Sequence, residues 1–342
     1  MMRHVAANFL TLIIFGMLAA YAAVEWGRAE YRAPGPTTEV SVFTVERGAR
    51  LNRVAERLEA QGIIESATIF GLGARYTDLA DDLKFGEYSI PAAASMEEIM
   101  EIFASGRGID YKVTIPEGFS TFQVIARLNA VEDLEGVITL EPAEGAIAPD
   151  TYSFQRGESR DSVLQKMMDR QQEIIAEEWE LRQADLPYDS PEDALIMASI
   201  VEKETGVGAE RDVVAGVFVN RLRQGMKLQT DPTVIYGLTL GKESLGRGLR
   251  RSELARRTPY NTYIIDGLPP TPIANPGRAS IKAALNPADT DYIFFVADGT
   301  GGHAFAETLV EHNANVRKWR QIEAERRAAA EAAAAEEEAA TE

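Results

Sequence analysis

The sequence predicts an α+β protein in three parts: an N-terminal transmembrane helix, a small α/β module and a larger mixed α+β domain. Three observations support this. The chain begins with a long apolar run, continues with short alternating and amphipathic segments, and then mixes long helical patterns with few strands. We expect the following boundaries: cytoplasmic end and anchor 1–27, linker 28–39, small module 40–108, larger domain 109–320, and Ala/Glu-rich tail 321–342.

The apolar run extends from Val5 to Val24 without a charged residue, which is long enough to cross a bilayer as a helix. Arg3 and His4 precede it and Glu25 follows it. Because positive charge stays on the cytoplasmic side, the rest of the chain is expected outside the cytoplasm. A cleaved signal peptide is the alternative, since residues 20–22 resemble a cleavage site, although the run is longer than a usual signal-peptide core.

The small module is expected to begin after a linker that contains Pro34 and Pro36. Its sequence switches between strand-like alternation and amphipathic helical patterns. We expect strands at 40–45 and 85–90 and helices at 48–61, 66–77 and 95–105. The size and order of these elements suit a carbohydrate-binding module, and a spacer or packing domain is the other open interpretation.

The larger domain is expected to be mostly helical. Ser120 has the character of an N-cap before TFQVIARL, and Pro191 precedes another helix. The expected elements are a strand at 111–115, helices at 121–128, 159–185, 194–205 and 210–224, a Gly-rich loop at 237–248, a buried strand at 291–297, and a helix from 308. The tail after Arg327 has no apolar anchors, so it should be frayed or disordered.

Composition removes several classes of function. The chain of 342 residues is 45% hydrophobic, which is enough for a sizeable core. It has no cysteine, so thiolate nucleophiles, disulfides and Cys-ligated zinc are excluded, and its three histidines are too few for a His-rich metal centre. The net charge of −18 argues against a general nucleic-acid binder. Carboxylate chemistry without a metal or another cofactor is the main option left.

The segment ALIMASIVEKET, residues 194–205, is an apolar helical run that ends on two glutamates and a lysine. At about 100° per residue, Glu202 falls within roughly 20° of Leu195 and on the stripe of Ala198 and Ser199. We therefore expect Glu202 at the wall of a cleft, where burial favours the protonated form that a general acid needs. Glu204 lies about 200° round the helix, so it is expected to be structural.

Three later segments mix amide, hydroxyl, aromatic and proline residues, as sugar-binding loops do. They are LQTDPT at 228–233, TPYNTY at 258–263 and GLPPTPIANPG at 267–277. Aromatic rings stack on sugars, and the side chains of Gln229, Asn261 and Asn275 can bond hydroxyl and acetamido groups. Prolines stiffen such loops and so reduce the entropy lost on binding. The alternative is that these segments are turns, with their Asp-Pro and Asn-Pro pairs as turn formers.

A series of motifs in colinear order resembles the YceG-like family of endolytic murein transglycosylases. The motifs are IPEGFS, PDTYSF, ASIVEKET, VFVNRL, LQTDPTVIYG, TPYNTY, GLPP, IANPG and FVADGTGGHAF. The resemblance implies a single-pass inner-membrane protein with a LysM-like module and a catalytic domain that cuts peptidoglycan glycan strands, with the catalytic glutamate at Glu202. The chain departs from the family pattern at Ala146 and Ala148, where large apolar side chains are usual, and at Thr271, where glycine is common.

The resemblance also implies a mechanism that needs one carboxylate. Glu202 would protonate the glycosidic oxygen between MurNAc and GlcNAc, then take the proton of the MurNAc C6 hydroxyl as a 1,6-anhydro ring closes. The implied substrate-binding residues are Gln229, Asp231, Tyr260, Asn261 and Asn275. Asp231 is also the rival carboxylate, because a second catalytic acid would make the enzyme a water-using muramidase. As the first residue of a DPT turn, Asp231 would instead be structural.

The expected partners are peptidoglycan glycan strands, the inner membrane through the N-terminal helix, and peptidoglycan synthases, with no nucleic acid. The bulk of the chain is expected in the periplasm of a bacterium. A non-catalytic peptidoglycan-binding scaffold is the alternative from another class of function. His303, which follows the GTGG turn, is expected to be either a buried hydrogen-bonding residue or a substrate contact.

Overall fold

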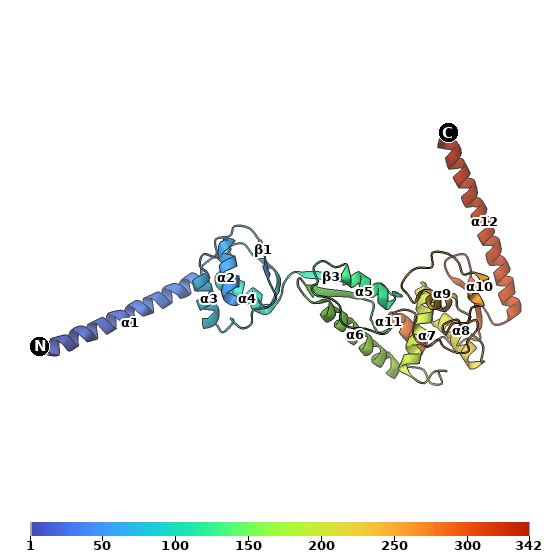
Figure 1. The fold of residues 1–342 in the computed structure, drawn as a ribbon, viewed down its shortest axis with the longest axis horizontal. Coiled ribbons are helices and arrows are strands. Elements are labelled where there is room, and N and C mark those ends of the chain that lie inside the picture. Colours follow the sequence, from blue (N-terminus) through green and yellow to red (C-terminus); the bar gives the residue numbers. More distant parts are fainter. Residues whose placement is uncertain (1, 342) are drawn as a thin grey trace. The chain divides into compact units, whose positions relative to one another are not determined.

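The computed structural model describes residues 2–341, which form two compact units (Figure 1). The first unit holds the chain up to Lys112 together with 132–136 and 153–159, and the second holds the remaining residues. The mixed α+β architecture and the long apolar N-terminal helix that the sequence predicts are confirmed.

The first unit packs helices against a two-stranded antiparallel sheet. Its elements are α1 (Met2–Arg32), β1 (Ser41–Val45), α2 (Leu51–Ala60), α3 (Ala67–Tyr76), β2 (Gly86–Ile90) and α4 (Met96–Ser105). The register of the sheet pairs Phe43 with Tyr88, and both rings lie against Phe103 of α4. Ser95 begins α4 through a capping box with Glu98, which satisfies two amide groups at the start of the helix.

α1 continues past the expected end of the membrane helix. Residues 28–32, predicted to belong to a linker, are its last helical turn. Tyr31 from this turn is 4% exposed and belongs to the core of the first unit. Its ring lies so close to Gly73 that a Cβ atom there would be 2.3 Å from the ring. By length and composition, Phe9–Arg32 is the helix within residues 2–341 that could span a membrane.

The second unit is mainly helical. Its principal elements are α5 (Thr121–Asn129), α6 (Arg160–Glu180), α7 (Pro191–Glu204), η1 (Gly208–Glu210), α8 (Arg211–Arg223), α9 (Asp231–Thr239), α10 (Arg251–Leu254), α11 (Arg278–Leu285), β5 (Phe294–Ala297), β6 (His303–Ala306) and α12 (Leu309–Thr341). β5 and β6 form an antiparallel hairpin. A further pair, β3 (Asp110–Thr114) with β4 (Thr151–Gln155), has its residues divided between the two units.

α7 is the central helix of the second unit. Ser190 caps it by accepting a hydrogen bond from the Asp193 amide at 3.1 Å, and Pro191 occupies its first turn, where a missing amide hydrogen costs nothing. Six consecutive residues, 196–201, are buried against α8, α11 and the surrounding segments. α7 therefore has no solvent-facing stripe over residues 196–201, and exposure returns only in its last turn, where Lys203 is exposed.

The structure bears out one local prediction in the second unit and corrects others. The N-cap at Ser120 is confirmed, since its hydroxyl accepts from the Gln123 amide. The Gly-rich loop predicted from residue 237 is wrong at its start, because α9 runs to Thr239. The expected DPT turn is instead the first turn of α9. The tail that was expected to be frayed or disordered is described as helix up to Thr341.

The close packing of α8 can be tested at Gly216. A Cβ atom on this residue would lie 2.7 Å from the backbone oxygen of Ala288, and a backbone atom cannot move aside as a side chain can. Gly216→Ala is therefore expected to lower the free energy of unfolding by about 1–2 kcal/mol, after the helix preference of alanine is subtracted. Gly208→Ala is the matched control, because its nearest neighbour is a flexible arginine end at 3.9 Å. Equal thermal unfolding midpoints for the two variants would contradict the prediction.

Candidate active site

The carboxyl-terminal turn of α7 presents two carboxylates to two different surroundings. α7 ends at Glu204, and Thr205 continues in an extended conformation with φ −134° while its amide still donates to the Val201 carbonyl at 3.3 Å. Glu202 extends toward the start of α11, whereas Glu204 extends toward the loop before α9. The surroundings of each carboxylate decide what it can do.

Glu202 joins α7 to the start of α11. Its Oε2 accepts a hydrogen bond from the Gly277 amide at 2.9 Å, and its side chain is 6% exposed. Arg211 lies with its Nη2 3.9 Å from Glu202 Oε1 and donates to Glu117 at 3.2 Å. A Cβ atom on Gly277 would be 1.9 Å from Glu117 Oε1, so these groups are packed without spare room. The predicted catalytic residue is thus a buried link between two helices.

Glu117 lies on the outer side of this group. Burial, followed by the negative charge of Glu202, raises the pKa of the Glu117 carboxyl, while Arg211 opposes the rise. Glu117 also borders an open cavity of about 730 Å³. The other lining residues are Glu178, Leu181, Arg278, Ala279, Lys282 and Asn286. Charged side chains of both signs therefore line this cavity.

Glu204 faces a different set of groups. The Thr230 hydroxyl donates a hydrogen bond to Glu204 Oε1. Burial raises the pKa of the Glu204 carboxyl above its ordinary value of 4.5, and the negative charge of Asp231 raises it further. The Thr230 hydrogen bond and the neighbouring His303 and Arg221 side chains lower this pKa and so act in the opposite direction. A buried carboxyl with a raised pKa is the form that general acid catalysis near neutral pH requires.

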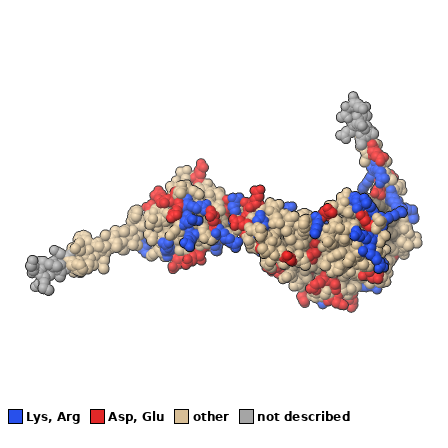
Figure 2. All heavy atoms as spheres, in the orientation of Figure 1, with Lys and Arg blue, Asp and Glu red and all other residues tan. Residues whose placement is uncertain are grey.

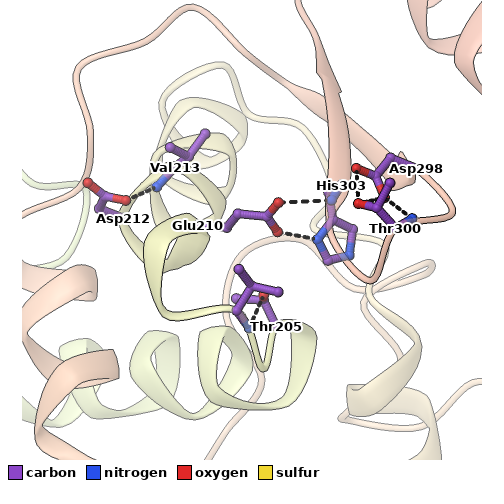
Figure 3. A network of polar contacts seen from close by, with 8 residues as sticks. Thr205, Glu210, Asp212, Val213, Asp298, Thr300 and His303 are labelled. Atoms are coloured by element: carbon purple, nitrogen blue, oxygen red, sulfur yellow. Dashed lines mark hydrogen bonds and ion pairs between the residues drawn. The ribbon is translucent and has the colours of Figure 1, made fainter.

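His303 is held in place by Glu210 at the end of η1 (Figure 3). Glu210 accepts from the His303 amide at 3.0 Å, and its other oxygen lies 2.8 Å from His303 Nδ1. A Cβ atom on Gly302 would be 2.4 Å from the Glu210 carboxylate, so the GTGG turn lets the carboxylate approach the backbone. This double contact fixes the ring orientation on β6 and leaves Nε2 as the nitrogen free for other contacts.

Gln229 and Asp231 flank the Thr230–Glu204 hydrogen bond and are both exposed. Gln229 has a left-handed backbone with φ 50°, a conformation that is strained for a residue with a side chain and is found often at functional sites. Asp231 is the first residue of α9 and accepts a hydrogen bond from the Tyr263 hydroxyl at 2.7 Å. The structure therefore places two predicted substrate-binding residues beside Glu204.

The TPYNTY loop is hydrogen-bonded to the segment that contains Gln229 and Thr230. The Thr262 carbonyl accepts from the Gln229 amide at 3.2 Å, and the Thr262 hydroxyl accepts from the Thr230 amide at 3.0 Å. Asn261 is fully buried, and its amide nitrogen donates to carbonyls at the end of α10, including that of Arg256 at 2.7 Å. Tyr260 is half-buried, with its hydroxyl 2.9 Å from that of Thr271.

Asn275 is likewise fully buried. Its Oδ1 accepts from the Ile147 amide at 3.0 Å, and its Nδ2 donates to the Phe119 carbonyl at 3.0 Å. The backbone of Asn275 also exchanges hydrogen bonds with Gly118 and Phe119. Both ends of the side-chain amide are therefore bonded to protein atoms, and Asn275 ties the GLPPTPIANPG segment to the loops before α5 and β4.

The structure brings the three loops together around the end of α7, but it divides the predicted residues into two groups. Gln229, Asp231 and Tyr260 are at least partly accessible, whereas Asn261 and Asn275 are buried in the scaffold. The sequence analysis did not predict the polar surroundings of Glu204. The available signal was its place at the end of the helical run, directly before Thr205. Among the described residues, no group of three or more His, Cys, Asp or Glu side chains could hold a metal ion.

Comparisons with known proteins find similar chains in other bacteria. The endolytic murein transglycosylase of Bacillus subtilis is 30% identical over 81% of this chain and 84% of its own length. That of Streptococcus pneumoniae is 26% identical over 80% of this chain, which matches 57% of the pneumococcal protein. A crystal structure of a YceG-like protein from Listeria monocytogenes aligns with 81% of this chain and 99% of its own, at 29% identity and a TM-score of 0.49.

The family model extends across the residues that build the site. It matches residues 43–318, which include α7 and all three loops around its carboxyl-terminal end. The chain therefore belongs to the YceG-like family.

Proposed function

We propose that the chain is an endolytic lytic transglycosylase that cuts the glycan strands of peptidoglycan. Family membership and the names of the Bacillus and Streptococcus relatives support this activity. The observation that carries the proposal is the Glu204 carboxyl, whose pKa is raised by burial and which lies among polar loops with exposed Gln229 and Asp231. This combination supplies a proton donor beside groups that can bond sugar hydroxyls.

Of the two α7 carboxylates, Glu204 takes the role of the general acid. Glu202 is engaged by the Gly277 amide and packs against Glu117 and Arg211, which suits a link between helices. Glu204 accepts the Thr230 hydroxyl on Oε1, and this leaves Oε2 to carry the proton. The assignment differs from the one that the helical phase predicts, which is Glu202.

The proposed mechanism uses this single carboxyl twice. Protonated Glu204 gives its proton to the glycosidic oxygen between MurNAc and GlcNAc as the bond from MurNAc C1 breaks. Positive charge develops at the anomeric carbon. The Glu204 carboxylate then takes the proton of the MurNAc C6 hydroxyl while that oxygen bonds to C1 and closes the 1,6-anhydro ring. No water is consumed, and Glu204 ends the cycle protonated.

The other predicted site residues divide by accessibility. Gln229 and Asp231 contact the sugars directly, and Tyr260 offers its ring at the edge of the site. Asn261 and Asn275 position the loops, because burial and their hydrogen bonds to protein groups commit their amides to the scaffold. The sequence analysis instead assigned all five residues to substrate binding.

A second candidate function is a water-using muramidase, and one observation favours it. Asp231 is exposed and lies near enough to Glu204 for its charge to raise the pKa of the Glu204 carboxyl. Hydrolysis with inversion or retention uses such a pair of carboxyl groups. Asp231 already accepts the Tyr263 hydroxyl and begins α9, which favours a structural or sugar-contacting role.

The decisive experiment is mass spectrometry of the products made by the purified full chain from intact peptidoglycan. Glycans that end in 1,6-anhydro-MurNAc, one water lighter than reducing ends, establish the transglycosylase. Reducing ends establish the muramidase and direct attention to Asp231. If wild type and Glu204→Gln bind the glycan equally and neither releases product, the chain is a scaffold.

The apolar helix α1 of the first unit supports a proposed cellular arrangement. α1 anchors the chain in the inner membrane with residues 109–320 as a catalytic domain in the periplasm, close to where synthases release new strands. Peptidoglycan synthases are therefore the proposed partners. The small module of residues 40–108 is LysM-like and binds glycan. Cosedimentation of Glu204→Gln with peptidoglycan, with and without substitutions on this module, tests the last point.

The pH dependence of cleavage tests the surroundings of Glu204. Because burial raises the pKa of Glu204, the rate should fall on the alkaline side at a pH above 4.5, by about tenfold per pH unit as the proton is lost. Asp231→Asn removes a negative charge and should shift this limb to lower pH. His303→Gln removes a neighbour that lowers the pKa of Glu204 and should shift the limb to higher pH. Shifts of the same sign in both variants would contradict the assignment.

A further inference from the structure

The junction between α1 and the small module contains a cavity that the proposed cleavage reaction does not use. It has a volume of about 770 Å³ and lies between the last turns of α1 and one side of α3. Most of its lining comes from the last turns of α1, at residues 23–25, 27–29, 31 and 32. The remainder comes from residues 69–77 on the α3 side, among them Leu72, Gly73 and Tyr76, and from Glu97 of α4. The cavity therefore begins where the apolar part of α1 ends.

α1 is fixed to the module at this point by three contacts. The Tyr31 ring packs directly on Gly73. Arg28 lies 4.6 Å from the centre of the Tyr76 ring and donates a hydrogen bond to its hydroxyl. Because Tyr31 is buried in the core, the module cannot rotate freely about the end of α1. The helix that enters the membrane therefore determines which face of the module lies next to the membrane.

Helix geometry places the cavity at a definite depth. The stretch from Val5 to Val24 carries no charge, and at about 1.5 Å per residue its length matches a hydrocarbon core of about 30 Å. Figure 2 shows that the described surface of α1 stays free of charged side chains until it nears the module. Glu25 ends the uncharged stretch, and Trp26 and Arg28 follow it. An aromatic and a basic residue at the end of an apolar helix are typical of the membrane–water interface.

The lining combines apolar and charged groups, and a phospholipid has both an apolar part and a charged headgroup. Three exposed large apolar side chains line the cavity: Val24 at 52%, Leu72 at 60% and Tyr76 at 66% exposure. Two arginines and two glutamates line it as well: Arg28 with Glu25 at 2.8 Å, and Arg32 with Glu97 at 3.1 Å. Arginine binds phosphate and a carboxylate binds an ammonium group, so the set matches a headgroup that carries both charges.

We propose that this cavity binds the zwitterionic headgroup of a membrane phospholipid, with the acyl chains lying along α1 below it. The proposal rests on the proposed membrane anchoring of α1. A soluble ligand fits less well, because exposed Leu72, Tyr76 and Trp26 would then stay in water, whereas acyl chains and the interface cover them. The bound lipid would hold the small module against the bilayer and so fix its distance from the membrane surface.

Photocrosslinking of the full chain tests the position of the cavity. The protein is reconstituted in vesicles of phosphatidylethanolamine with a minor share of phosphatidylglycerol. Benzoylphenylalanine replaces Leu72 in one sample and Val42 in the other, since Val42 is also exposed, at 56%, but lies on β1 away from α1 (Figure 1). We expect a phospholipid adduct by mass spectrometry from position 72, with a yield about tenfold above that from position 42. Equal yields would overturn the proposal.

Charge recognition is tested by substitution. Arg28→Ala should reduce the phosphatidylethanolamine that remains bound in native mass spectra about tenfold, as expected for one charge-assisted contact. Arg53→Ala, an exposed arginine on α2, is the control and should change nothing. Unchanged lipid retention in Arg28→Ala would contradict the site. Competition by soluble glycerophosphoethanolamine would show that the headgroup alone is recognised and would overturn the part assigned to the acyl chains.

Membrane anchoring is measured separately by extraction with alkaline carbonate. If the wild-type chain is extracted, the anchor proposal fails and the lipid result has no bearing on the bilayer. If the chain stays in the membrane while position 72 gives no adduct above the control, anchoring stands and the headgroup site fails. The two failures are therefore distinguishable.

Discussion

Glu204→Gln is expected to reduce the rate of glycan cleavage by a factor of about 10³ or more, because loss of a general acid typically costs 10² to 10⁴. Glutamine keeps the size of the side chain and can still accept the Thr230 hydroxyl that bonds Glu204 Oε1. The substitution therefore removes the proton while it preserves the packing. Initial rates of product release from intact peptidoglycan, compared with the wild type, measure the effect.

Glu202→Gln is the matched variant on the same helix turn. Its amide oxygen can still accept from the Gly277 amide, which lies 2.9 Å from Glu202 Oε2, so the link between α7 and α11 should survive. We expect a change in rate of less than about tenfold. If Glu202→Gln loses cleavage and Glu204→Gln keeps it, the acid is Glu202, as the helical phase of the sequence predicts. Unfolding midpoints for both variants separate a chemical effect from a loss of fold.

The two glutamates show why sequence periodicity could locate the site but could not choose the residue. A helical phase separates a buried face from an exposed one only when the helix has both. α7 is buried on all sides over residues 196–201, so both carboxylates enter protein surroundings. Thr230 and Asp231 lie more than twenty residues later in the chain than the two glutamates. No local sequence pattern can therefore predict which glutamate they surround.

A local signal predicted the start of α5, because a Ser before an amphipathic run indicates an N-cap and Ser120 is one. Ser95 and Ser190 cap their helices in the same way, although the sequence analysis did not name them as caps. The Asp231-Pro232 pair was ambiguous because Pro is favoured both in turns and in the first turn of a helix. The structure shows the second case, and the residues that follow the pair, not the pair itself, decide between them.

The sequence could not predict which of the amide side chains are buried. Gln229, Asn261 and Asn275 are all amides in Pro-containing or polar segments, and their composition alone gives them the same sugar-binding character. Asn275 is buried because its loop passes between Phe119 and Ile147, two positions far away in the chain. Gln229 is exposed with a left-handed backbone. Tertiary contacts, which sequence patterns do not contain, make this distinction.

Asn275→Ala is expected to lower the free energy of unfolding by about 2–4 kcal/mol, because it leaves the buried Ile147 amide and Phe119 carbonyl without their side-chain partner. Both groups now bond Asn275 at 3.0 Å. For a chain of this size each kcal/mol corresponds to about 2–4 °C in the unfolding midpoint, so thermal unfolding of the full chain should resolve the change. Any loss of cleavage should follow the loss of folded protein.

Gln229→Ala is the control that separates scaffold from substrate contact. Its side chain is exposed, so the unfolding midpoint should stay within the effect of about 0.5 kcal/mol that is usual for surface changes, while KM for glycan rises. An unchanged midpoint for Asn275→Ala together with a raised KM would return Asn275 to the substrate contacts that the sequence predicts.

Asn275→Asp sharpens the test because it keeps the acceptor for the Ile147 amide and changes the donor alone. The second oxygen would face the Phe119 carbonyl and the Glu144 carboxylate, whose Oε1 is 3.3 Å from Asn275 Nδ2. Burial already raises the pKa of Glu144, and the new carboxyl should meet the same conditions, with its pKa in the folded state raised above the unfolded value. Its ionisation then costs stability as pH rises through the folded pKa, so this variant should be least stable at neutral pH and recover part of its midpoint in acid. A substrate-contacting asparagine on an accessible loop would show no such pH dependence of unfolding, since water would solvate the new charge.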